Sequence, residues 1–307
     1  MKAFRYSIAL LCLFSSCNDD VDFKGKEPAS KMVVNAVINS QSDTNLIKLS
    51  ESTFIYSDVK PKLIENPNME VKINDRPVTT SFDHVKRMNS YYNFTASLHP
   101  GDKVEVSVHT AEHGTVYGAD IVPQAPVIAS VHYEWFTGQD NYSRLRTLVT
   151  VKDKPNEKNY YRILIKGKSI LEYEGAPTFD EVDWQFLDVH VDQEILFNHI
   201  DGIAGNDTDT HTYRIFSDDL FQGKEYTLNV YVRQDKPWED SWGMVIRRLI
   251  KVEIHALSES LYLYLRSLEI ASNEDIFQEP VKVYTNIEGG YGVLGIYNAN
   301  EKIIELK

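Results

Sequence analysis

Short runs in which apolar and polar residues alternate recur along this sequence, and they constrain its fold more than any other feature. In the run 103–108 the valines occupy every second position, while Lys103, Glu105 and Ser107 occupy the others. Residues two apart point to the same face of a β-strand, so this pattern predicts a strand with one buried and one wetted face. Runs of the same character predict further strands and an all-β protein: 32–38, 46–49, 71–73, 145–151, 160–165, 225–232 and 245–254.

Turn residues divide these runs into two groups. Asn74-Asp75-Arg76-Pro77 predicts a hairpin after the run 71–73, and Val122-Pro-Gln-Ala-Pro126 predicts a domain boundary because neither proline can donate to a sheet. The length of 307 residues is enough for two domains. We therefore expect an immunoglobulin-like β-sandwich over residues 31–122 and a second β-rich, sandwich-like domain over residues 127–307.

One segment near the C-terminus has helical spacing. Leu261, Tyr264, Leu265 and Leu268 share one face of a helix starting after Ser258, whose hydroxyl can cap the first turn. We expect this single short helix to pack on the second sandwich, with its apolar stripe in the core.

The first sixteen residues have the layout of a targeting signal. Lys2 and Arg5 precede an apolar stretch that is too short to span a bilayer, and two serines then lead to Cys17. This order resembles the lipobox at which bacterial lipoproteins are cut and acylated, so residues 1–16 are predicted to be a signal peptide and Cys17 the lipid-bearing residue. An ordinary signal peptide cut nearby, or an apolar N-terminal strand, is the alternative.

An acidic run follows the predicted lipidation site. Asn18, Asp19, Asp20 and Asp22 resemble the signal that exports lipoproteins to the outer face of the outer membrane in Bacteroidota; a solvated linker is the alternative. Residues 17–30 would then form the acylated cysteine and a flexible acidic tether. Loss of residues 1–16 removes two cations and no acid, and the resulting charge of 30 − 45 = −15 argues against nucleic acid as a partner. It would also remove Cys12, which leaves no thiol for a disulfide.

The most distinctive stretch is 279–297, in which Gly289, Gly290, Gly292 and Gly295 are spaced among apolar residues. These glycines allow positive φ or close backbone approach, as a tight turn between core strands needs. A phosphate-binding loop is disfavoured because no helix and no Lys-Ser/Thr pair follows.

Together with the lipobox, the opening strand "VVNAVI", the turn-strand "PGDKVEV" and the helix, this stretch resembles a surface-lipoprotein family of Bacteroidota, the domain of unknown function 4249 (DUF4249). The resemblance implies an accessory role beside a TonB-dependent outer-membrane receptor. It carries over no catalytic or binding residue.

Two further patterns are candidate metal sites. His109 and His113 match the string H-x-x-E-H of inverted zinc peptidases, but the preceding alternation and Gly114 favour a hairpin over a helix. A loop with the composition of a calcium site is formed by Asp201, Asn206, Asp207 and Asp209, although its register is not that of an EF-hand and a solvated loop is favoured. No metal and no cofactor is therefore expected.

Two tryptophans and several carboxylates complete the candidate sites. Trp238 and Trp242 lie in a polar loop, where exposed rings can contact a sugar or a protein; the alternative is that both cover the end of the sandwich. The acid groups Asp180-Glu181, Asp183 and Glu239-Asp240 are of a kind that glycosidases use, but they are also common on surfaces.

The functional expectation is a lipid-anchored protein of the outer membrane that faces the cell exterior and binds ligand for a TonB-dependent receptor. It would touch the membrane only through its lipid and would catalyse no reaction. An adhesive or structural cell-surface lipoprotein with a protein partner is one alternative, and an envelope hydrolase is another.

Overall fold

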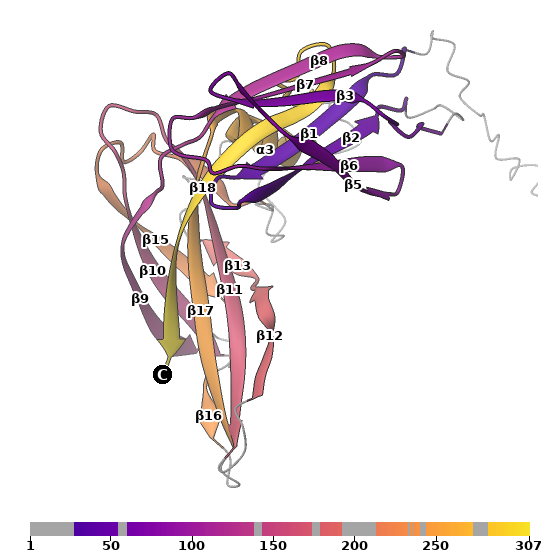
Figure 1. Ribbon diagram of the computed structural model, residues 1–307. Coiled ribbons are helices and arrows are strands. Elements are labelled where there is room, and N and C mark those ends of the chain that lie inside the picture. The colour runs from indigo at the N-terminus through magenta and orange to yellow at the C-terminus, as the bar shows by residue number, and fades with distance from the viewer. Residues whose placement is uncertain are drawn as a thin grey trace, which may run out of the picture.

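The computed structural model describes residues 28–54, 60–137, 143–173, 179–191, 213–232, 234, 236–239, 244–272 and 282–307. These residues form two β-sandwich lobes, placed at an angle to each other, and one helix, α3 (Glu259–Ser272), near the C-terminus (Figure 1). The predicted all-β, sandwich-like architecture with one helix is confirmed.

The strands are numbered in chain order, and the two lobes divide them into two consecutive groups. The upper lobe in Figure 1 contains β1 (Met32–Asn39), β2 (Thr44–Glu51), β3 (Asn68–Ile73), β4 (Arg76–Val78), β5 (Thr80–Lys86), β6 (Asn89–Thr95), β7 (Lys103–Thr110) and β8 (Gly114–Ile121). The lower lobe contains β9 (Val127–Thr137), β10 (Ser143–Lys152), β11 (Tyr160–Tyr173), β12 (Phe179–Phe186), β13 (Val189–Val191), β14 (Ile215–Ser217), β15 (Glu225–Val232), β16 (Trp238–Glu239) and β17 (Met244–Leu257). The last strand, β18 (Tyr291–Leu306), runs through both.

One ten-stranded sheet is shared by the two lobes. Its path is β12-β11-β17-β18-β1-β2-β6-β5, with β14 and β16 added at the side. In the upper lobe this sheet is faced by the four-stranded sheet β4-β3-β7-β8, and in the lower lobe by β13-β15-β10-β9. Each sandwich has its own apolar core between the facing sheets.

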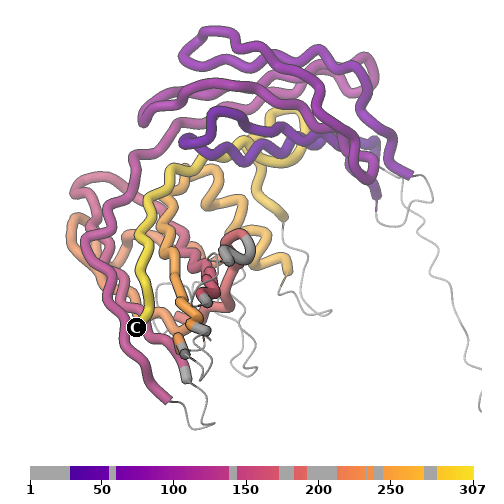
Figure 2. Tube along the Cα trace, turned by 60° about the horizontal axis from the view of Figure 1, so that its bottom comes forward, coloured from indigo at the N-terminus to yellow at the C-terminus, as the bar shows by residue number. Residues whose placement is uncertain are grey.

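Strand β18 joins the two sandwiches, as the continuous chain trace in Figures 1 and 2 shows. Its first half pairs in parallel with β1 from Val33 to Asn39, and its second half pairs antiparallel with β17. Leu294 and Ile296 therefore lie in the core of the upper lobe. A boundary after Val122 separates β8 from β9, but it does not separate the two cores, because residues 287–297 return to the first sandwich.

The predicted alternation explains how the strands build the cores. Val104, Val106 and Val108 of β7 are buried, while the residues between them face water or lie half-buried. The predicted hairpin at Asn74-Asp75 joins β3 to β4. Burying one such side chain stabilises the fold by roughly 1.5–3 kcal/mol, so the alternation fixes the register of each strand.

The glycine-rich stretch serves close backbone approach. Gly292 has a φ of 103°, and a Cβ there would lie 2.0 Å from the carbonyl oxygen of Val34 on β1. A Cβ on Gly295 would lie 2.8 Å from Cβ of Leu261 on α3. The prediction of a turn between two core strands is wrong for the first strand, because residues 282–287 form no strand. Instead, the Asn286 side chain bonds the main chain of Leu294 at 2.8 and 3.0 Å and replaces the strand ladder.

Helix α3 is capped and buried largely as predicted. The amide of Leu261 donates to Ser258 Oγ at 3.3 Å, and Leu261 and Leu265 are buried. Tyr262 is buried as well, while Tyr264 is only half-buried, so the helix is rotated slightly from the predicted face. Its apolar side packs on Ile215 and Leu257 and lies beside β18, where the lobes meet. No helix within the described ranges has the length and apolar character needed to cross a bilayer.

Candidate functional site

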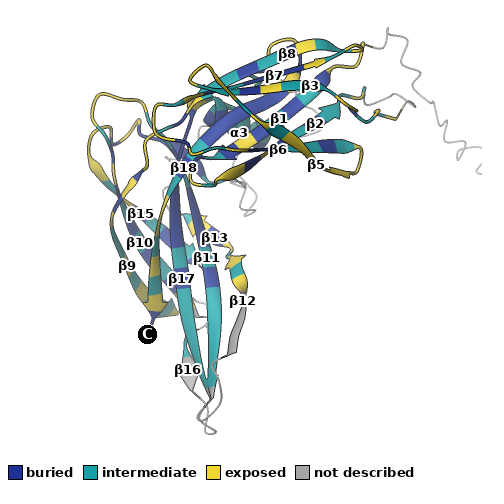
Figure 3. Ribbon diagram, in the orientation of Figure 1, coloured by how far each residue is buried: buried dark blue, intermediate teal, exposed yellow. Residues whose placement is uncertain are grey.

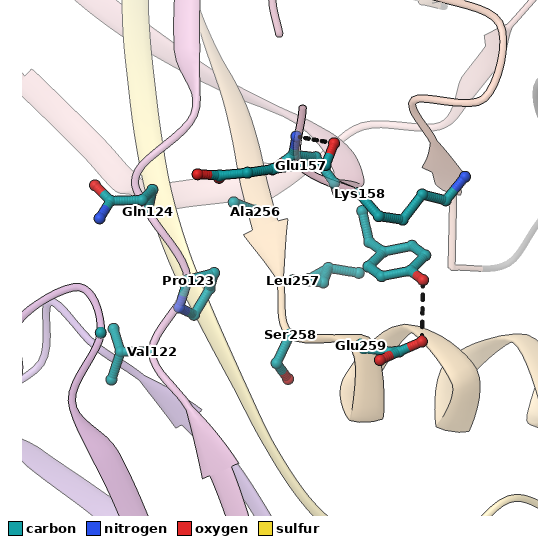
Figure 4. Close-up of a pocket in the computed structure, with 12 residues that line it drawn as sticks. Val122, Pro123, Gln124, Glu157, Lys158, Ala256, Leu257, Ser258 and Glu259 are labelled. Atoms are coloured by element: carbon teal, nitrogen blue, oxygen red, sulfur yellow. Dashed lines mark hydrogen bonds between the residues drawn. The ribbon is translucent and has the colours of Figure 1, made fainter. Parts of the chain in front are cut away.

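A pocket of about 450 Å³ lies at the junction of the two lobes (Figure 4). Four separate segments form it: the turn before β7, the link from β8 to β9, the loop before β11, and the passage from β17 into α3. Its lining consists of Gly101, Val122, Pro123, Gln124, Glu157, Lys158, Asn159, Tyr160, Ala256, Leu257, Ser258 and Glu259.

The link between the lobes is restricted by its prolines and bonded by asparagines of β18. Asn298 Nδ2 donates to the Pro123 carbonyl at 3.0 Å, and Asn300 Nδ2 donates to the Pro126 carbonyl at the same distance. Proline restricts its own φ and biases the preceding residue toward extended backbone. The segment 122–126, which predicted a domain boundary, therefore forms one wall of the pocket. The Gln124 side chain on it is exposed.

Tyr160 and Glu259 form the aromatic wall. The Tyr160 hydroxyl donates to Glu259 Oε1 at 3.2 Å, and its ring stacks on Tyr262 with centroids 4.4 Å apart. Burial, together with the neighbouring Glu259 carboxylate, raises the pKa of Tyr160 to about 12. The phenol is therefore protonated at neutral pH and acts as a hydrogen-bond donor and a stacking surface.

Lys158 forms the charged wall. Its ammonium lies 3.3 Å from Asp218 Oδ1 and also pairs with Asp219, and it sits 5.9 Å from the centroid of the Tyr160 ring. The buried Asp218 carboxylate is further held by the Asn159 amide at 2.8 Å. Because two carboxylates neutralise this lysine, the exposed Glu157 carboxylate dominates the charge on this side of the pocket.

A half-buried acid, Asp120, lies where the pocket floor meets β18. Ser258 lines the pocket and exchanges hydrogen bonds with Ile296, whose amide donates to the serine hydroxyl at 3.1 Å. Burial raises the pKa of nearby Asp120 to about 6, although hydrogen bonds from Ser258 and the main chain act in the opposite direction. Asp120 is therefore the acid beside the junction whose charge changes in the weakly acidic range.

A second polar cluster lies on the outer face of the lower lobe and is internally paired. Lys166 Nζ is 2.7 Å from Glu253 Oε1, and His255 Nε2 is 3.2 Å from Glu253 Oε2. Burial opposes ionisation of Glu253, but the bonds from His255 and Lys166 prevail and lower its pKa to about 2. Within the described residues, no three His, Cys, Asp or Glu side chains are grouped as ligands for a metal.

The histidine pair predicted from the sequence lies on the β7–β8 hairpin and not on a helix. His109 Nδ1 is 2.9 Å from Thr115 Oγ1, whereas His113 Nε2 is 3.3 Å from Glu51 Oε1. The two rings therefore have different partners, and the expected hairpin is confirmed.

Most other candidate residues stay predictions. Trp238 begins β16 and pairs with Ile246 of β17 along the backbone. Asp180, Glu181 and Asp183 lie on β12, an end strand of the large sheet. The following residues lie outside the described part of the chain: Cys17, Asn18, Asp19, Asp20, Asp22, Asp201, Asn206, Asp207, Asp209, Asp240 and Trp242.

Comparison with known proteins identifies the family. The model of a family described as a domain of unknown function (DUF4249) matches residues 18–303, so this chain belongs to that family. A search of curated proteins finds no match.

Two solved structures are similar only at a low level. A β-glycosidase from Bacteroides vulgatus shows 10% identity and a TM-score of 0.18, over 74% of this chain and 23% of the enzyme. The B domain of a biofilm associated protein shows 7% identity and a TM-score of 0.19, over 88% of this chain and 85% of that domain. Similarity as low as this gives no information about the activity of the chain.

Proposed function

We propose that this protein is a lipoprotein of the outer membrane that faces the cell exterior and serves as an accessory binding subunit of a TonB-dependent receptor. The structural observation that supports a binding role is the pocket at the junction of the lobes. The lipobox-like sequence ending at Cys17 supports the anchor, and the resemblance described above supports the receptor as partner.

The walls of the pocket are suited to binding a polar ligand. Tyr160 offers a ring face, while Gln124 and Glu157 offer exposed amide and carboxylate groups. Ligand sites commonly combine an apolar surface with a few convergent polar groups. The ligand we propose is therefore a polar small molecule or peptide end that packs beside the Tyr160 ring and donates hydrogen bonds to the Glu157 carboxylate and the Gln124 amide oxygen.

The shared strand supports capture by a preformed site. Strand β18 holds two of the walls, because Asn298 Nδ2 donates to the Pro123 carbonyl and the Ile296 amide donates to Ser258 Oγ. A site that is already ordered loses less conformational entropy when it binds. The proposed role is to hold cargo at the entrance of the receptor and release it unchanged.

Complementation of a deletion strain tests this role. The gene carrying Gln124→Ala with Glu157→Ala, which changes two exposed pocket residues, is expected to restore protein level but not nutrient uptake. Lys224→Ala, an exposed change in the lower lobe, serves as the matched control and should restore both. Unchanged uptake in the deletion strain, across nutrient classes, would refute the proposal.

The competing adhesive role makes a different prediction. A cell-surface protein with a protein partner and no transport role would lose attachment, and not uptake, when the gene is deleted. Measuring both phenotypes in the same strain separates the two roles.

A further inference from the structure

The β5–β6 hairpin exposes an unusual amount of apolar surface. All residues from 81 to 88 are exposed (Figure 3). Phe82, Val85 and Met88 are 58%, 47% and 46% exposed. Strand β5 is also the last strand of the ten-stranded sheet. An exposed apolar cluster on an edge strand marks a contact surface or a risk of aggregation.

The turn at the tip of this hairpin has a strained backbone. Arg87 and Met88 have φ values of 50° and 61°, in the left-handed region, where long side chains are disfavoured. The β3–β4 hairpin makes the same two-residue turn with Asn74 and Asp75, which tolerate this region.

Asn89 stabilises the strained turn. Its Nδ2 donates to the carbonyls of Lys86 and Arg87 at 3.0 and 2.9 Å. Strain of this kind persists mainly where the side chains serve a function. In this chain the tip therefore carries an arginine and a methionine where the turn itself suits asparagine or glycine.

The hairpin tip points toward the end of the lobe where the chain enters. Ser90 pairs with Leu49 of β2, and Glu51 of β2 pairs with Met32 at the start of β1. The tip and the start of β1 are thus at the same end of the sheet, two to three strand spacings apart, a lateral distance of about 10–14 Å. The 11 residue steps from Cys17 to Pro28 can span at most about 40 Å.

The charge at the tip is opposite to that of the whole chain. Lys86 and Arg87 are exposed at the turn, whereas the net charge of the chain is −13. The neighbouring Asp83 is paired with His84 at 2.5 Å. Basic and apolar side chains together are the combination that favours the interface of an anionic bilayer.

We propose that the β5–β6 hairpin is a second membrane contact, in which Phe82, Val85 and Met88 enter the bilayer interface while Lys86 and Arg87 bind lipid phosphates. This inference rests on the lipid anchor at Cys17 that is part of the proposed function. Two attachment points would fix the orientation of the upper lobe, whereas a lipid on a tether alone leaves it free to turn. The lower lobe and the junction pocket would then face away from the bilayer.

A fluorescent probe at the tip tests the contact. The full chain is expressed as the acylated protein with Met88→Cys, labelled with an environment-sensitive dye, and reconstituted in vesicles of phosphatidylcholine with phosphatidylglycerol. Removal of Cys12 and acylation of Cys17 leave the introduced thiol as the labelling site. Ile121→Cys is the control, since Ile121 is 57% exposed and lies at the end of β8 that is away from the β5–β6 hairpin tip.

The expected result is a blue shift of the dye at residue 88 and quenching by nitroxide-bearing lipids that is several-fold stronger than at residue 121. Adding Lys86→Glu and Arg87→Glu to Met88→Cys should abolish both effects, whereas adding Lys224→Glu should leave them. Equal quenching at both positions overturns the proposal. So does a blue shift that appears without vesicles and grows with protein concentration, because it reports contact between copies.

The mass of the purified protein shows whether Cys17 carries lipid, and so tests the anchor separately from the contact of the β5–β6 hairpin with the membrane. A protein without lipid on Cys17 refutes the proposed anchor, whatever the hairpin does. A protein with the lipid but without quenching at residue 88 leaves the anchor intact and refutes only the hairpin contact.

Discussion

Replacing Asp120 by asparagine is expected to stabilise this protein above pH 6 and to have little effect near pH 4. The folded protein raises the pKa of this carboxyl from its ordinary value of 3.8 to about 6, chiefly through burial. An acid whose folded pKa is raised binds protons more tightly in the native state. The wild type therefore loses stability as pH rises from about 4 to 6.

The magnitude follows from the same two values. At about 1.4 kcal/mol per pKa unit, the difference between 3.8 and about 6 corresponds to at most about 3 kcal/mol. Asparagine cannot ionise, and its amide oxygen can still accept the bond that Ile121 donates to Asp120 Oδ1 at 2.9 Å. Asp120→Asn should thus gain up to about 3 kcal/mol over the wild type at pH 7.5.

Urea unfolding at pH 4.5 and pH 7.5 measures the difference between variant and wild type at each pH. Asp43→Asn, at an exposed aspartate of the same lobe, is the control and should remain within about 0.5 kcal/mol of the wild type at both. If Asp120→Asn gave the same difference at both pH values, or were destabilising at pH 7.5, the account of Asp120 as an ionised acid whose pKa is raised by loss of solvent contact would be wrong.

Three further predictions concern other parts of the fold. Gly292→Ala should lower the free energy of unfolding by about 3 kcal/mol or more, because it adds a steric clash at a residue with positive φ. Gly101→Ala is the control: Gly101 has a φ of 91° but nothing near its added Cβ, so this change should cost only about 1–2 kcal/mol. Chemical denaturation of the two variants measures the difference. Glu253→Gln should cost up to about 3 kcal/mol above pH 4.5, and this difference should vanish as pH falls toward 2, which a pH series of denaturation curves checks. Arg87→Asn with Met88→Gly should raise stability by about 1–2 kcal/mol in thermal unfolding by relieving the turn; an unchanged or lower stability would contradict strain there.

Local sequence patterns predicted the helix and the strands with regular alternation, but they gave no range for strands such as β5, β6, β8, β9 and β12. Alternation of valines predicted β7 because the side-chain period of a strand is set by the backbone alone. Helix α3 was predictable because Ser258 both caps the helix and interrupts the preceding strand. These signals depend only on residues a few positions apart.

The joining of the two lobes left no such signal. The parallel pairing of β1 with β18 connects residues more than 250 positions apart, and neither strand differs in pattern from one that pairs nearby. Gly292 was correctly expected to permit close approach, but the sequence did not identify the partner, which is the carbonyl of Val34.

The junction pocket was not predicted for a related reason. Its lining comes from four segments that include Gly101, Gln124, Tyr160 and Glu259, and none of these segments carries a ligand-binding motif. The prolines of the link predicted a boundary between domains, and such boundaries commonly form ligand sites. That general tendency was the available hint, and it identifies no residue.

The central claim, an accessory role beside a receptor, is tested most directly by isolating the native complex. The acylated protein should be captured from gently solubilised outer membranes and its partners identified by mass spectrometry, with Cys17→Ala as the control for anchoring. The account predicts that a TonB-dependent receptor is recovered in near-equal amount with the wild type. Recovery of the lipoprotein alone would contradict it.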